Sequence, residues 1–253
     1  MKLQFLSVNG WRPDREEEDT VSLLINDTIM IDTGWNCVRN LLRAGKTPRD
    51  VSHLLFTHMH QDHYLSLPAF LFYLLNSYQD ASTVSIYGPG RVEEVVDQSL
   101  TFAGRHIYYE SCPSPAVRRL CAGDSLVIGS VRVDTCPSRH AVEGLCYRFT
   151  DLDSGSVCVY TGDTAPTDAI TSFSRGCDVL IHEQSYGIDA PSDRPNSFSH
   201  STVREAAECA RDAGAGRLFL VHCPSSNRDE SLSFARGIFP EAYRPENESV
   251  LMI

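Results

Sequence analysis

Directly after an apolar run of strand length, the chain contains the stretch Leu54-Leu55-Phe56-Thr57-His58-Met59-His60-Gln61-Asp62-His63. Its last six residues carry four side chains that can bind a metal ion. In a loop that leaves a strand, alternate side chains point the same way, so His58 and His60 can reach one ion while Asp62 and His63 reach another. Imidazole and carboxylate groups suit zinc and related first-row metals, whereas magnesium and calcium favour oxygen ligands alone.

A single histidine after a strand is most often an ordinary surface-loop residue. The pattern HxHxDH is different because it crowds several polar groups against an apolar strand. Such crowding is costly unless the groups bind something together. The stretch therefore indicates a metal site.

Three further potential ligands follow strand-like runs elsewhere in the chain. His140 comes after residues 131–135, Asp163 after 157–160 and His222 after 218–221. If these strands lie side by side, their ends form one rim where the side chains converge. Taken singly, His140 fits a loop residue equally well, and Asp163 in the sequence TGDT fits a residue that stabilises a turn.

The pattern of apolar runs favours an α/β fold in a single domain that spans residues 1–253. Strands are expected over residues 3–8, 21–25, 28–31, 53–56, 83–87, 125–128, 131–135, 145–150, 156–160, 179–182 and 217–221. Helices are expected over 37–44, 65–76, 91–102, 168–174 and 203–213, the last with a capping box of Thr202 and Glu205. Residues 104–123 and 184–199 are expected to be irregular loops. Hairpins mixed with helix connections indicate two mixed sheets packed face to face, with helices outside.

Composition narrows the function classes. The formal net charge of −11 works against nucleic-acid binding, which depends on clustered Lys and Arg. The sequence contains no apolar run of membrane-spanning length and no export signal, so we expect a cytoplasmic protein that does not contact membranes. The nine cysteines form no CxxC pair and are expected to be reduced thiols, most of them in the core.

The sequence HMHQDH, the lone His140, the TGDT around Asp163 and the late His222 resemble, in order, the motifs of the metallo-β-lactamase superfamily. Asp32 matches the early aspartate of that family, which is structural and lies beneath the metal loop. The resemblance implies a four-layer αβ/βα sandwich.

The resemblance also implies a dinuclear centre. In this pattern His58, His60 and His140 hold one divalent ion, Asp62, His63 and His222 hold the second, and Asp163 bridges them. We expect zinc, with manganese or iron as alternatives. Such a pair lowers the pKa of a bridging water, so that a hydroxide nucleophile exists near neutral pH. Asp62 is also a candidate for orienting that nucleophile.

A closer likeness to the ribonuclease Z branch rests on His182-Glu183-Gln184-Ser185 followed by His200-Ser201-Thr202. It implies that His200 contacts the scissile phosphate or acts as general acid, and that Glu183 supports it. An alternative is that His200 is only a residue near a helix N-terminus.

Several departures from that branch argue against maturation of tRNA. The tRNA-gripping arm is missing, because only a hairpin fits between residues 141 and 162, and Asn9-Gly10-Trp11-Arg12-Pro13 replaces the glycine-rich loop. We therefore expect hydrolysis of a small or nucleotide-derived phosphodiester, with a small-molecule substrate. A lactonase or carboxylic esterase is the alternative enzyme, and a non-catalytic binding or assembly member is the alternative of another class. A homodimer remains open.

Overall fold

In the computed structural model, residues 1–188, 199–223 and 228–253 are described. The expected loop 184–199 therefore lies largely outside the described residues. Two seven-stranded mixed sheets dominate the fold.

The first sheet comes mainly from the N-terminal half of the chain. Its strands are β1 (Lys2–Ser7), β2 (Ser22–Ile25), β3 (Ile29–Ile31), β4 (His53–Leu55), β5 (Ser85–Gly88), β6 (Ala116–Arg119) and β14 (Val250–Met252), in the order β14-β1-β2-β3-β4-β5-β6. Pairing is antiparallel from β14 to β3 and parallel from β3 to β6.

The second sheet follows along the chain. Its strands are β7 (Ser125–Ile128), β8 (Val131–Pro137), β9 (Leu145–Asp151), β10 (Val157–Tyr160), β11 (Val179–Glu183), β12 (Arg217–Val221) and β13 (Ala242–Tyr243), in the order β13-β12-β11-β10-β9-β8-β7. Pairing is antiparallel from β7 to β10 and parallel from β10 to β13. Between His140 and Asp163 the described chain forms only the β9–β10 hairpin, as expected.

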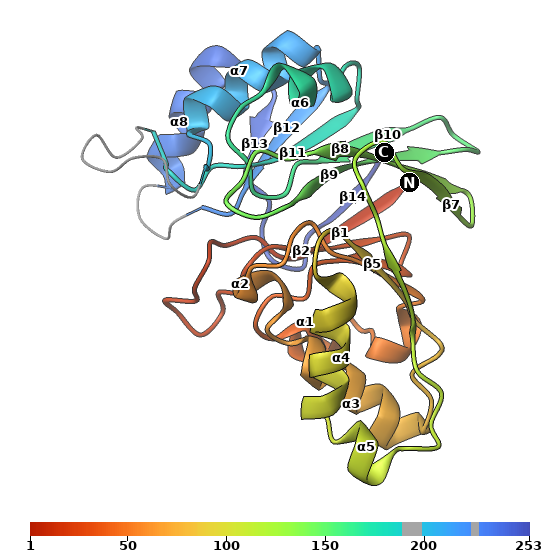
Figure 1. Ribbon diagram of the computed structural model, residues 1–253. Coiled ribbons are helices and arrows are strands. Elements are labelled where there is room, and N and C mark those ends of the chain that lie inside the picture. Colours follow the sequence, from red (N-terminus) through yellow and green to blue (C-terminus); the bar gives the residue numbers. More distant parts are fainter. Residues whose placement is uncertain (189–198, 224–227) are drawn as a thin grey trace.

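The helices lie outside the two sheets. They are α1 (Cys37–Arg43), the 3-10 helix Pro48–Asp50, α2 (Gln61–Tyr64), α3 (Leu67–Tyr78), α4 (Val92–Phe102), α5 (Arg105–Tyr108), α6 (Asp168–Phe173), α7 (Val203–Ala213) and α8 (Arg228–Ile238). Figure 1 shows α3, α4 and α5 on the far side of the first sheet and α6, α7 and α8 on the far side of the second. This arrangement confirms the predicted four layers.

Three apolar clusters hold the layers together. The central cluster lies between the sheets and joins Phe5 and Ile31 of the first to Val133 and Tyr160 of the second. The other two lie between each sheet and its own helices. Because apolar burial is the main favourable term in folding, these clusters fix the sheets relative to one another and hence the edge where the strands end.

The expectation of an irregular loop over residues 104–123 was wrong. This segment contains helix α5 and strand β6. Strand β6 is an edge strand with the sequence AVRR and a mostly exposed burial pattern, so it lacks the alternation that marks a half-buried strand. The pattern also left helix α8 and the short strands β13 and β14 unpredicted.

Two whole-chain features complete the description. Eight of the nine cysteines are buried, and only Cys121 is exposed. Across the described ranges, every helix is too short or too polar to cross a lipid bilayer.

Candidate metal centre

The sheet topology brings the predicted ligands to one edge. Strands β8, β10, β11 and β12 run in the same direction, because β8 and β10 are both antiparallel to β9 and β10 to β12 are parallel. His140, Asp163 and His222 all follow the carboxyl ends of these strands, and Glu183 is the last residue of β11. The first sheet supplies the HxHxDH segment from the end of β4.

The HxHxDH segment is not an extended loop, contrary to the expectation that alternate side chains would sort the ligands. His60 is the N-cap of the one-turn helix α2, from which Asp62 and His63 project. The helical turn brings Asp62 and His63 close to His222, whereas His58 and His60, which precede it, lie beside His140.

Two groups of three donors match the two predicted ligand sets. The donor atoms of His58, His60 and His140 lie within 4.8 Å of one another, and so do those of Asp62, His63 and His222. In the first group His60 Nδ1 is 3.1 Å from His58 Nε2 and 3.0 Å from His140 Nε2. Nitrogens about 2 Å from a tetrahedral metal lie about 3.3 Å apart, so this spacing suits one ion.

Asp163 stands between the two groups. Its Oδ2 atom is 3.4 Å from His63 Nε2 and 3.6 Å from His222 Nε2. The same oxygen is 3.9 Å from His58 Nε2 and 4.0 Å from His140 Nε2. One carboxylate therefore faces nitrogen donors of both groups, as a bridging ligand does.

Hydrogen bonds behind the ligands fix which nitrogen faces the centre. Asp32 lies beneath the metal loop, as expected: it accepts hydrogen bonds from Thr57 N and Thr57 Oγ1, both at 2.8 Å, and lies 2.9 Å from His63 Nδ1. Because His63 Nδ1 donates to this carboxylate, the Nε2 lone pair is left for a metal.

Three other supports were not foreseen from the sequence. Thr57 Oγ1 lies 3.0 Å from His58 Nδ1, Ser185 Oγ 2.7 Å from His222 Nδ1, and the Ser199 carbonyl 3.3 Å from His140 Nδ1. The Thr57 and Ser185 hydroxyls donate to Asp32 and Glu183, so they accept from the imidazoles. Each of these histidines therefore also presents Nε2. The only sequence signal was that Thr57 directly precedes HxHxDH and that Ser185 ends the segment His182-Glu183-Gln184-Ser185.

The donor set fits metal ions by a further test. Among the described residues, His63 Nε2, His222 Nε2 and Asp163 Oδ1 are buried and have no hydrogen-bond partner. Buried polar atoms without a partner are rare because each carries a desolvation cost. Cations bound at this centre would give all three atoms a partner and so explain why they are buried without a hydrogen bond.

Burial and charge set the protonation of the cluster. Burial lowers the pKa of His58 well below its ordinary value and that of His140 to about 4. Burial alone would raise the pKa of Asp163, but His222 and His63 hold it well below its usual range. The neutral imidazoles of His58 and His140 and the ionised carboxylate of Asp163 are the forms that bind metals. Although burial alone would lower the pKa of His63, the nearby carboxylates, Asp62 foremost, raise it above its ordinary value, so that a metal would displace a proton there.

His200 lies beside the cluster and is held by Glu183. His200 Nδ1 is 2.9 Å from Glu183 Oε1, and the His200 ring centroid is 4.9 Å from that of His140. The fully buried Glu183 also accepts hydrogen bonds from the backbone N–H groups of Thr164, Ser185 and Ser201. Although burial lowers the pKa of His200, the bond to Glu183 raises it above the ordinary value.

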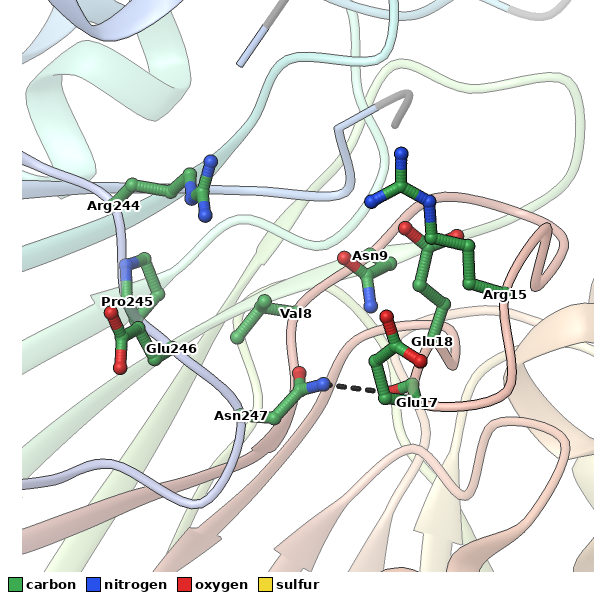
Figure 2. A pocket seen from close by; sticks show the side chains of 9 residues that line it. All are labelled: Val8, Asn9, Arg15, Glu17, Glu18, Arg244, Pro245, Glu246 and Asn247. Carbon is green, nitrogen blue, oxygen red and sulfur yellow. Dashed lines mark hydrogen bonds between the residues drawn. The ribbon is translucent and has the colours of Figure 1, made fainter. Parts of the chain in front are cut away.

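A surface pocket of about 150 Å³ borders the backbone that supports His222. Figure 2 shows Arg15 and Arg244 on opposite walls, with Asn247 Nδ2 donating to the Glu17 carbonyl at 2.8 Å. Three glutamates share the lining with the two arginines, so its charge is mixed. None of the predicted ligands lines this pocket, which therefore is not the metal centre.

The fold and the site together define a metal-dependent hydrolase that binds divalent metal. The chain belongs to the beta-lactamase superfamily, whose domain it matches over residues 27–223. It is similar to ribonuclease BN of Cronobacter sakazakii, with 26% identity over 98% of this chain and 98% of that relative.

Other likenesses agree with this family. Ribonuclease Z of Pyrococcus furiosus is 25% identical, over 96% of this chain and 93% of that relative. The metallo-beta-lactamase fold protein YhfI from Bacillus subtilis has a TM-score of 0.80 at 22% identity, covering 99% of this chain and 98% of that one. At this identity the structural likeness concerns the fold.

Proposed function

We propose that the protein is a dinuclear phosphodiesterase that hydrolyses a small or nucleotide-derived phosphodiester. The observation that carries this proposal is the pair of donor groups on either side of Asp163, with His200 beside them. His58, His60 and His140 would hold one ion, and Asp62, His63 and His222 the other, with Asp163 between them. We propose zinc as the metal because imidazole donors predominate.

Divalent ions held by these residues would supply Lewis-acid stabilisation of developing negative charge and would lower the pKa of a bound water. Asp62 would also orient that water; its Oδ2 lies 3.4 Å from His63 Nε2 and its side chain is partly exposed, which supports this role. His200 would act from its imidazolium form, which the bond to Glu183 favours: the Nδ1 proton stays hydrogen-bonded to Glu183, and the Nε2 proton would pass to the departing oxygen. The carboxylate of Glu183 would stabilise the positive charge of the His200 imidazolium.

Two observations support a phosphodiester as the class of substrate, and two others support a small one. The relatives are named as ribonucleases, which act on phosphodiester bonds, and the proposed roles of His200 and Glu183 suit the same chemistry. Between His140 and Asp163, however, the described chain has only the β9–β10 hairpin, and the net charge is −11. We therefore propose a small substrate in place of tRNA.

The test is a substrate panel assayed with zinc-loaded protein and with chelator-treated protein as control. The panel contains bis(p-nitrophenyl) phosphate, 2′,3′-cyclic nucleotides and acyl lactones. We expect zinc-dependent cleavage of the phosphodiesters. Turnover of lactones alone would show a lactonase or esterase, and no turnover with metals fully bound would show a binding member of the family.

A further inference from the structure

Two partly exposed tryptophans lie together at the surface, and they are the only tryptophans in the chain. The exposed fractions are 48% for Trp11 and 39% for Trp35. The indole Nε1 of Trp35 donates a hydrogen bond of 3.2 Å to the carbonyl of Trp11. A scattered exposed aromatic residue needs no explanation, but two exposed tryptophans joined by a hydrogen bond from one indole to the backbone of the other residue form a surface feature of their own.

The backbone connects both tryptophans to ligands of the second donor group. Next to Trp35, the N–H groups of Thr33 and Gly34 donate to the His63 carbonyl at 2.8 and 3.3 Å. On the side of Trp11, the Val8 carbonyl accepts from His222 N at 3.0 Å. Each tryptophan therefore lies within three residues of a backbone hydrogen bond to His63 or His222.

The buried carboxylate of Asp19 holds the Trp35 segment to the Trp11 segment. Its Oδ1 accepts from Trp35 N at 2.7 Å and Thr20 N at 2.8 Å, and Oδ2 accepts from Asn36 N and Asn40 Nδ2 at 2.8 Å. Thr20 Oγ1 donates in turn to the Gly10 carbonyl, next to Trp11.

Gly34 permits this close approach. Its φ is +63°, and a Cβ there would lie 2.9 Å from Asp19 Oδ1. A side chain at this position would push the Trp35 turn away from the carboxylate. The tryptophans are therefore displayed on a tightly bonded support, which limits the ordering cost of binding a ligand.

We propose that Trp11 and Trp35 form a stacking platform for a planar ring of the substrate, in particular a nucleobase. The proposal rests on the phosphodiesterase function and narrows its substrate to a nucleoside phosphodiester. The phosphate binds at the metal centre while the base lies on the indoles beside the second donor group. Stacking on aromatic side chains is favourable for every base, so the platform selects for a base without fixing which one.

Fluorescence of the zinc-loaded protein tests the platform without any turnover. Because all indole emission comes from these two residues, a base stacked on them quenches the signal directly. The probes are adenosine 5′-monophosphate and ribose 5-phosphate, which share the phosphate and the sugar and differ only in the base. We expect quenching by the nucleotide and little change with the sugar phosphate.

Variants assign the effect to the two residues. We expect W11L and W35L each to weaken nucleotide binding about 10-fold or more while ribose 5-phosphate binding, measured by titration calorimetry because it does not quench, stays unchanged. W11F and W35F keep an aromatic face and should restore most of the affinity. The matched control is F102L, because Phe102 is 83% exposed but belongs to α4 and not to the platform.

The outcomes separate this proposal from the catalytic one. Equal binding of the two probes by the wild-type protein, or an equal loss for both probes in W11L and W35L, overturns the platform. Loss of base preference in F102L does so as well. Base-dependent quenching in a protein that hydrolyses no phosphodiester would keep the platform and reject the proposed reaction.

Discussion

The Oδ2 atom of Asp32 lies 2.9 Å from Nδ1 of His63, and both side chains are fully buried. Asp32 follows β3 and His63 lies in α2, so the contact joins the first sheet to the metal loop. Asp32 adopts a positive φ of 53°, a conformation that Asn also tolerates. This pair fixes the orientation of one predicted ligand.

Asp32→Asn should weaken metal binding at the second donor group by about 10- to 100-fold. The variant amide can still accept from Thr57 N, but its NH₂ group would face the His63 Nδ1 donor, so the ring loses its fixed orientation. Metal content after dialysis against graded chelator measures the effect. Asp50→Asn, an exposed site, is the control and should keep wild-type metal content.

Ser185→Ala should also weaken the second ion by about 10- to 100-fold and leave the first in place. The substitution removes the hydroxyl that lies between His222 Nδ1 and Glu183 Oε2. Competition titrations that resolve two binding steps would show the difference. An equal loss of both ions would contradict the assignment of Ser185 to the second group.

His200→Ala should slow phosphodiester cleavage by about 100-fold or more while metal content stays at the wild-type level. The reason is that His200 is assigned to proton transfer and not to holding an ion. Rates with a poor leaving group should fall more than rates with p-nitrophenolate, which needs little protonation. An unchanged rate with both leaving groups removes the assigned role.

Gly162→Ala should destabilise the protein far more than Gly155→Ala. Both glycines have a positive φ, +58° and +79°, so each substitution carries a backbone cost of about 1–2 kcal/mol. A Cβ at 162 would also lie 2.7 Å from Thr57 Cβ, whereas nothing lies within 4 Å at 155. Urea unfolding of the two variants compares them, and equal losses would show that Thr57 moves away freely.

Asp151→Asn should lower stability at neutral pH by about 1 kcal/mol, and the loss should fade in acid. Hydrogen bonds from the backbone N–H groups of Ser154 and Asp153 lower the pKa of Asp151. Because the pKa of Asp151 is lower in the folded than in the unfolded state, its carboxylate stabilises the folded protein at pH values above the unfolded pKa of about 3.9. This contribution is lost as the pH falls through the pKa of the folded state. Melting temperatures between pH 7 and pH 3 check the sign, with exposed Asp153→Asn as control.

Local patterns in the sequence predict the donor residues of the site and the layers of the fold. The HxHxDH stretch, the order of His140, Asp163 and His222, and the apolar runs are local patterns that a linear reading can recognise. They predicted the two mixed sheets, most strands and helices, and the donor groups that the structure brings together. The remaining elements were not predicted because their local patterns are weak, as in the polar edge strand β6.

The groups that support the ligands, and the way the loops meet, follow from tertiary packing. Ser185 reaches His222 across 37 residues, and Asp19 reaches Trp35 across 16. Neither contact leaves a periodic trace in the sequence, because each depends on where the strands of a packed sheet end. Long-range hydrogen bonds of this kind form only after the apolar layers have packed and brought distant segments together. A short segment of sequence contains no information on that packing.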